Sequence, residues 1–284
     1  MKKKTWKIIA LVLALVLLGG VLFYANAFLG NPVSKLLATR NAKRYVAEAY
    51  AGTDYVVGEV SYSFKEGCYI ADVSSPSSAD TYFIVNYDFL GRRGYDSYEM
   101  QVVNRGNVWR RLEQEYRDLC DRVLEGDGFP YELDIAYGTL DTSVSVEEIP
   151  EPGVRPEQLP PTELELDRQY DIPALGAKYG KLVLYVEDTD VSVDRAAEIL
   201  PEVRRLLEEG GAPFFYLDFV LEPPREEGKP RGETLNILNF PAADIYEEDM
   251  TQRVAEAAAE AEDYYAKMDA IRAAEEAAIL ETQS

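Results

Sequence analysis

A long apolar run near the N-terminus constrains this chain more than any other feature. The 22 residues from Ile8 to Leu29 contain one strongly polar member, Asn26, and four lysines precede them. As a helix the run would be about 33 Å long, enough to cross the roughly 30 Å hydrocarbon layer of a bilayer. We therefore expect a transmembrane anchor over residues 1–30, with residues 8–29 in the membrane.

A cleaved signal peptide is the alternative to a retained anchor. Signal peptides have a shorter apolar region of about 7 to 15 residues, which favours retention. Ala25-Asn26-Ala27 nevertheless has the small-x-small spacing of a signal peptidase site, so cleavage after Ala27 stays open. Because the lysines precede the run, the positive-inside rule keeps the N-terminus in the cytoplasm. The expected location is the cell membrane, with a single span and an extracytoplasmic body.

The charge distribution argues against a nucleic-acid partner. The chain carries 29 Lys and Arg against 51 Asp and Glu, a net charge of −22. Its first carboxylate is Glu48, so the basic residues before it leave a strongly acidic body. Such a body repels nucleic acid.

The chain has no histidine and two isolated cysteines. This composition excludes histidine-based acid/base catalysis, Ser-His-Asp or Cys-His nucleophiles, and zinc sites built from Cys and His. A phosphate-binding Gly-rich loop is also missing from the sequence. We therefore expect no catalytic residue and no cofactor. Cys68 and Cys120 could form a disulfide that closes a loop of about 50 residues. We favour the alternative, in which both are buried free thiols.

Apolar periodicity divides the body into helices and strands. Residues 33–50 have helical spacing, with Ser34 as a candidate N-cap, and 56–64, 68–73, 81–87 and 95–103 have the features of strands. A helix that ends near Gly126 follows, with Asn104 or Asn107 at its start. Beyond a Gly-Pro break, strands are expected at 181–187, 214–222 and 234–240, and helices at 192–209 and from Met250 onward.

The pattern predicts an α+β fold: the N-terminal transmembrane helix, two α+β domains with antiparallel sheets, and a C-terminal helix. The expected boundaries are 1–30 for the anchor, 31–126 and 127–245 for the two domains, and 246–284 for the last helix. A Pro-rich loop interrupts the second domain at 149–161.

Three stretches carry a resemblance to a known family: GNPVSK at 30–35, FKEGCY at 64–69 and VSVDRAAEIL at 191–200. In these motifs and in their order the chain resembles the YfjL-like family of Gram-positive bacteria, over most of residues 1–245. That family is an uncharacterised set of membrane-anchored proteins. The resemblance implies location and architecture, and it transfers no catalytic residue.

The densest carboxylate cluster, Asp188, Asp190 and Asp194, is a weak candidate for a calcium site. Its spacing departs from the EF-hand loop, because apolar residues stand where that loop needs its glycine and its final glutamate. A strand end followed by a helix capped at Ser192 explains the cluster more simply.

Two aromatic or apolar patterns also have alternative interpretations. Six tyrosines of the first domain either form a platform for glycan or peptide or are simply half-buried on strands, which we favour. They are Tyr62, Tyr69, Tyr82, Tyr87, Tyr95 and Tyr98. In the last helix an apolar seam packs on its own domain or, alternatively, on a partner helix. Its members are Val254, Ala257, Ala261, Tyr264, Met268 and Ile271.

These features lead us to expect a non-catalytic envelope module that binds another protein. The alternatives are a histidine-independent hydrolase, using a carboxylate pair on envelope glycan or peptide, and a structural spacer. A hydrolase requires facing carboxyl groups in a cleft, one with a raised pKa. A binding module requires exposed apolar surface, which we expect on the sheet faces that bear the tyrosines.

Overall fold

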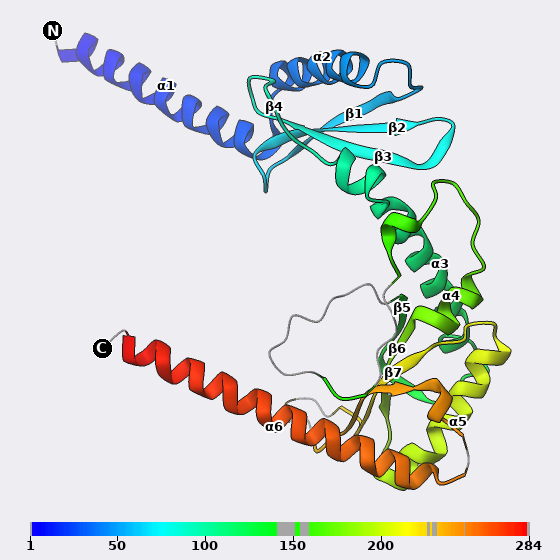
Figure 1. Cartoon of the computed structure of the whole chain (residues 1–284). Helices are drawn as coiled ribbons and strands as arrows, with labels where there is room; N and C mark the ends of the chain where they lie inside the picture. Colours follow the sequence, from blue (N-terminus) through cyan, green and yellow to red (C-terminus); the bar gives the residue numbers. More distant parts are fainter. Residues whose placement is uncertain are drawn as a thin grey trace. The chain divides into compact units, whose positions relative to one another are not determined.

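The computed structural model describes residues 2–140, 151–153, 159–225, 228, 232–246 and 248–282 (Figure 1). Of the Pro-rich loop expected at 149–161, residues 149–150 and 154–158 fall outside the described residues. The chain divides into two compact units. Unit 1 comprises Met1–Trp109 and Pro161–Arg168, and unit 2 comprises Arg110–Pro160 and Gln169–Ser284.

The structure corrects the expected fold class at its first element. The N-terminal run is helical, as α1 (Lys2–Leu29). Within the described part of the chain, however, no helix is both long enough and apolar enough to cross a membrane. The prediction of a single transmembrane helix is therefore wrong. The run folds as a helix, as its composition predicts, but helix formation by itself does not establish a membrane span.

In unit 1, helix α2 (Pro32–Ala49) starts one turn earlier than its predicted cap. Asn31 is the N-cap: its Oδ1 accepts a hydrogen bond from the Ser34 backbone N–H at 2.8 Å. The proline that follows suits the first turn, where its missing N–H costs nothing. Ala38, Ala42 and Val46 are buried at four-residue spacing, so one stripe of the helix faces the core.

That stripe packs on an antiparallel sheet of order β1-β2-β3-β4 (Figure 1). The strands are β1 (Val56–Ser63), β2 (Cys68–Ser75), β3 (Ser78–Tyr87) and β4 (Arg93–Asp96). Buried side chains alternate along β2 and β3, with Ala71, Phe83 and Val85 in the core beneath α2. The antiparallel prediction is confirmed for this sheet.

The strand predicted at 95–103 is wrong beyond Asp96. The carboxylate of Asp96 accepts a hydrogen bond from the Tyr98 N–H at 2.8 Å, which turns the backbone out of the sheet. A π-helical turn, η1 (Glu99–Val103), follows. Helix α3 (Gly106–Leu124) then begins, and Asn107 lies inside its first turn as a buried side chain that donates to the carbonyl groups of Asp80 and Tyr82.

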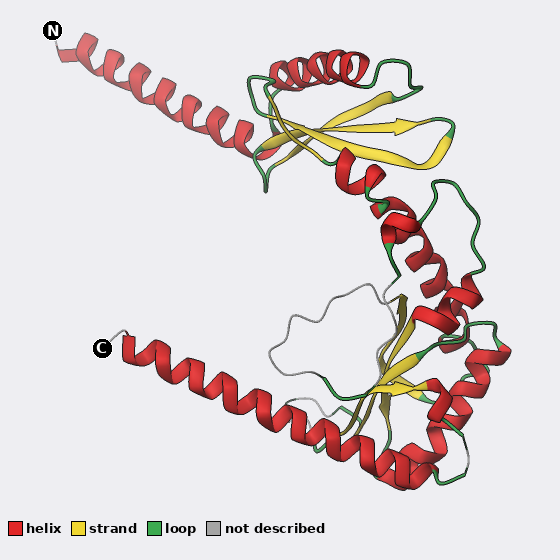
Figure 2. Cartoon of the chain, viewed as in Figure 1, coloured by secondary structure: helices red, strands yellow, loops and turns green. Residues whose placement is uncertain are grey.

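Unit 2 is built on the sheet β5-β6-β7-β8, with helices on it (Figure 2). Its elements are β5 (Glu132–Leu140), α4 (Ile172–Tyr179), β6 (Gly180–Glu187), α5 (Val193–Glu209), β7 (Tyr216–Glu222), β8 (Leu235–Pro241) and α6 (Met250–Thr282). Short 3-10 turns lie at η2 (Pro161–Glu163), in unit 1, and η3 (Ala242–Asp244).

The second sheet is mixed, which corrects the expectation of antiparallel sheets. β6 and β7 pair in parallel, with Leu182 opposite Leu217, while β5 and β8 pair antiparallel at the edges. The physical reason is the intervening helix, because α5 is a crossover that returns the chain to the same end of the sheet. No residue of the two central strands is exposed: β7 is buried at six of its seven residues, and β6 is buried or half-buried throughout, as expected of strands covered on both faces.

Helix α5 confirms its predicted cap, since the Ser192 Oγ accepts from the Arg195 N–H at 3.2 Å. In α6, Met250, Val254, Ala261 and Tyr264 are buried, and the helix contacts β8 and α5. The first half of the predicted seam therefore packs on its own unit.

Candidate functional site

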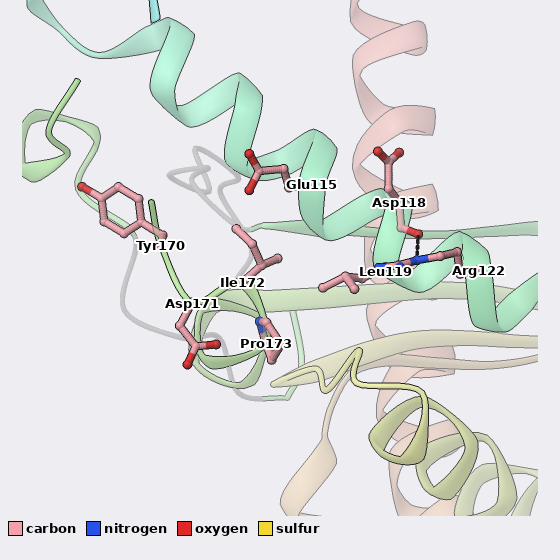
Figure 3. Close-up of a pocket in the computed structure, with 8 residues that line it drawn as sticks. All are labelled: Glu115, Asp118, Leu119, Arg122, Tyr170, Asp171, Ile172 and Pro173. Carbon is pink, nitrogen blue, oxygen red and sulfur yellow. Dashed lines mark hydrogen bonds between the residues drawn. The ribbon is translucent and has the colours of Figure 1, made fainter. Parts of the chain in front are cut away.

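A pocket of about 650 Å³ lies in unit 2 between α3 and the start of α4 (Figure 3). Its lining combines apolar and acidic side chains. It is formed by Glu115, Asp118, Leu119, Arg122, Tyr170, Asp171, Ile172 and Pro173.

Two elements position these side chains. Glu115, Asp118, Leu119 and Arg122 recur at three- and four-residue spacing, so they share one face of α3. Figure 3 shows the other wall, Tyr170 to Pro173, on the segment that enters α4. There Asp171 is the N-cap, and its Oδ1 accepts from the Ala174 N–H at 3.1 Å.

The carboxylates of this pocket are held by separate partners. Glu115 accepts from the Arg111 Nη1 at 3.1 Å, and Asp118 accepts from the Gln114 Nε2 at 2.7 Å. Asp171 is engaged as an N-cap. Within the part of the chain that the structure describes, none of these three groups has another carboxyl group as its hydrogen-bond partner. The pocket therefore presents acidic groups beside an apolar floor. This arrangement suits the binding of a ligand with basic and apolar side chains better than it suits proton transfer.

An adjoining surface hollow of about 450 Å³ contains Asp121, in the last turn of α3, and Glu125, the residue directly after this helix. Burial raises the pKa of Asp121, and the nearby negative charge of Glu125 adds to the effect. Here a carboxyl group with a raised pKa lies beside a second carboxyl group.

The predicted acidic cluster has a structural role. The Asp188 carboxylate accepts from the Asp190 N–H at 2.9 Å and from the Arg195 Nε at 2.8 Å. Asp194 lies in the first turn of α5. Over the described residues, no group of three or more Asp, Glu or Cys side chains is arranged to hold a metal ion. The cluster marks the start of α5.

Both cysteines are free thiols. Cys68 is half-buried on β2, and its Sγ lies 3.5 Å from the Glu66 Oε2. Cys120 is buried in α3, where burial raises the pKa of its thiol to about 12. A thiol with this pKa stays protonated at neutral pH and is a poor nucleophile.

The six tyrosines do not form one platform. Tyr69 and Tyr87 are buried, Tyr62 and Tyr98 are half-buried, and only Tyr82 and Tyr95 are exposed. The aromatic surface expected on the sheet is therefore mostly core, as strands that alternate between a covered and an open face require.

Several lining residues of the unit 2 pocket were missed in the sequence, because helix α4 was not predicted. The signal was present: Asp171 followed by Pro173 has the N-cap and first-turn proline of a helix start. The preceding Pro-rich stretch masked this signal.

Comparison with known families identifies both halves of the chain. The family model described as the YfjL-like N-terminal domain matches residues 5–97, and the one described as the YfjL-like C-terminal domain matches residues 115–255. No curated protein and no solved structure matches the chain. The two matches occur in chain order and together span most of the sequence, so the chain belongs to the YfjL-like family.

Proposed function

We propose that this protein is a non-catalytic binding module whose unit 2 pocket takes a segment of another protein that bears apolar and basic side chains. The observation that carries this proposal is the lining of the pocket. Leu119, Ile172 and Pro173 supply apolar contact, while three carboxylates and a single arginine surround them.

The charge of unit 2 supports the same partner chemistry. Unit 2 contains 39 acidic and 16 basic residues, a net charge of −23, whereas unit 1 has a net charge of +1. A field of this sign accelerates the encounter with a basic segment and disfavours acidic ones.

The compartment of this partner is part of the proposal. An apolar run that is preceded by lysines and contains Ala25-Asn26-Ala27 near its end has the features of an export signal, which supports an extracytoplasmic body and an envelope protein as partner. A reporter enzyme that is active only outside the cytoplasm, fused after Ser284, tests this location. Activity comparable to that of a cytoplasmic control fusion would contradict it.

Peptide binding tests the pocket directly. We expect the full chain to bind apolar peptides that contain Lys or Arg, and to bind matched peptides with Glu at those positions at least ~10-fold more weakly. The double variant Glu115→Gln/Asp118→Asn should weaken binding of the basic peptides. Its matched control, Glu260→Gln/Asp263→Asn on α6, removes the same charge outside the pocket. Equal loss in both variants would show diffuse charge attraction rather than a site.

A hydrolase is the second candidate, and the pair Asp121 and Glu125 is the observation that favours it. Turnover of envelope glycan or peptide by the full chain, abolished by Asp121→Asn and by Glu125→Gln, would replace the binding module with an enzyme. We expect no turnover, because the two groups lie side by side at the end of α3 rather than across a cleft from each other.

A further inference from the structure

A second pocket, in unit 1, has the opposite charge. Its volume is about 300 Å³, and it lies between α2 and the connection from β3 to β4. Three arginines line it, Arg44 from α2 and Arg92 and Arg93 from the connection and the start of β4. The one carboxylate among its lining residues is Glu48.

Two of these arginines are available to a ligand. Arg92 pairs with Asp88 at 2.6 Å, but within the described residues neither Arg44 nor Arg93 forms an ion pair. The guanidinium of Arg93 lies over the ring of Tyr45, 4.3 Å from its centroid. This stacking orients the group without using its N–H donors.

The hydroxyl of Tyr87 supplies a third donor. Tyr87 lines the pocket and is 1% exposed, yet its hydroxyl has no hydrogen-bond partner among the described residues. Burial raises its pKa to about 12, although Arg93 and Arg44 are near enough to oppose the shift. The hydroxyl is therefore protonated at neutral pH, and a buried donor without an acceptor is unfavourable unless a ligand supplies one.

Apolar side chains border this pocket. Leu90 lines it and is 52% exposed, and the adjacent Phe89 is 61% exposed. Leu37 of α2 lies beside the next residue, Gly91, since a Cβ on Gly91 would be 3.0 Å from the Leu37 Cβ. An anionic group attached to an apolar body would therefore find contacts for both parts.

We propose that this pocket binds a phosphate group, with Arg44, Arg93 and the Tyr87 hydroxyl as donors. Three donors from different elements suit a tetrahedral oxyanion with several acceptor oxygens better than a planar carboxylate. The same chemistry is offered by free phosphate and by the phosphate of an anionic lipid headgroup.

Two binding measurements on the full chain separate these sources. The first titrates inorganic phosphate by calorimetry, and the second compares vesicles of phosphatidylcholine alone with vesicles that also contain phosphatidylglycerol. We expect binding in at least one arm, weakening as salt is raised. In the vesicle arm the measured quantity is the additional binding caused by phosphatidylglycerol, because adsorption through exposed apolar surface would not depend on the headgroup.

Matched variants locate the binding. Arg44→Gln/Arg93→Gln should weaken it at least ~10-fold, because charge-assisted hydrogen bonds are lost. Tyr87→Phe should weaken it about 3- to 10-fold. The control Arg40→Gln/Lys43→Gln removes two charges from the same helix outside the pocket and should change affinity less than ~2-fold.

Each outcome decides the proposal. Binding of inorganic phosphate identifies the free anion as ligand, and binding only to phosphatidylglycerol vesicles identifies the lipid headgroup. Absence of both, or equal losses in the pocket and control variants, would overturn the proposal. If circular dichroism shows that the double arginine variant is unfolded, Tyr87→Phe decides, because that hydroxyl makes no hydrogen bond within the described chain.

Discussion

Asp80 and Asp167, 87 residues apart, exchange hydrogen bonds through their carboxylates and backbone N–H groups. The Asp167 N–H donates to the Asp80 Oδ2 at 2.7 Å, and the Asp80 N–H donates to the Asp167 Oδ1 at 3.2 Å. Nearby, the Arg105 Nε donates to the Leu164 carbonyl at 2.9 Å. These contacts fix residues 161–168 to unit 1, although they follow β5 of unit 2 in the sequence.

We predict that Asp80→Ala lowers the free energy of unfolding by about 2 kcal/mol, because Asp80 is buried and its carboxylate accepts from backbone N–H. Residues 161–168 should also become more sensitive to limited proteolysis. The control is Asp72→Ala, an exposed position on β2. Unchanged cleavage in Asp80→Ala would show that other contacts hold the segment.

In unit 2, the buried ring of Tyr116 occupies a niche bounded by glycines. Its hydroxyl donates to the Pro213 carbonyl at 3.0 Å, and a Cβ on Gly176 would overlap the ring. We predict that Gly176→Ala destabilises the protein by about 2 to 4 kcal/mol, since ring and helix must separate. Gly128→Ala, with nothing within 4 Å of its Cβ, is the control. Urea unfolding that is equal for the two variants would contradict this packing.

The sequence predicts most elements of this fold, because their signals are local. Periodicity identifies α2 and the strands of unit 1, and a serine before a helical pattern identifies the cap of α5. The parallel pairing of β6 with β7 depends on the crossover through α5, which a strand-by-strand interpretation overlooks. The end of β4 depends on the Asp96 turn rather than on hydrophobic pattern.

The candidate sites are less predictable, because they combine residues from distant segments. Arg44 and Arg93 are 49 positions apart in the sequence, and only the packing of α2 against the β3–β4 connection brings them to one pocket. Likewise, Leu119 of α3 and Ile172 of α4 line one pocket although they are far apart in the sequence. The net charge of the chain follows from its composition. How that charge is divided between the two units does not, because the division depends on which unit residues 161–168 and the two parts of α3 belong to.

A pH-dependent effect is expected at Asp188. The Asp190 N–H and the Arg195 guanidinium hold the pKa of Asp188 below its usual value of 3.8. Because the folded-state pKa is depressed, the carboxylate stabilises the protein above the unfolded pKa, and this contribution is lost as pH falls through the folded one. Asp188→Asn should therefore lower the free energy of unfolding at pH 7 by about 1 kcal/mol.

The difference between wild type and Asp188→Asn should disappear between about pH 4 and about pH 2, where the wild-type carboxyl group is protonated. Asp190→Asn, which alters an exposed neighbour, is the control. Urea unfolding across this pH range measures the effect. A gap that persists unchanged at the acidic end would mean that the loss comes from packing rather than from the charge.

Two tyrosines of unit 1 allow a matched test of how much a hydroxyl group contributes to the stability of the fold. The Tyr45 hydroxyl donates to the Asp96 Oδ2 at 2.6 Å, while the buried Tyr87 hydroxyl has no partner within the described residues. Tyr45→Phe should lower the free energy of unfolding by about 1 to 2 kcal/mol, and Tyr87→Phe should leave it unchanged or raise it by up to about 1 kcal/mol.

If phosphate binds beside Tyr87, adding phosphate should raise the melting temperature of wild type more than that of Tyr87→Phe, since a ligand stabilises the state it binds. Denaturant and thermal unfolding in chloride and in phosphate buffers of equal ionic strength measure both effects. A loss in Tyr87→Phe as large as that in Tyr45→Phe, in chloride alone, would reveal an internal partner for the hydroxyl and remove it from the proposed phosphate site.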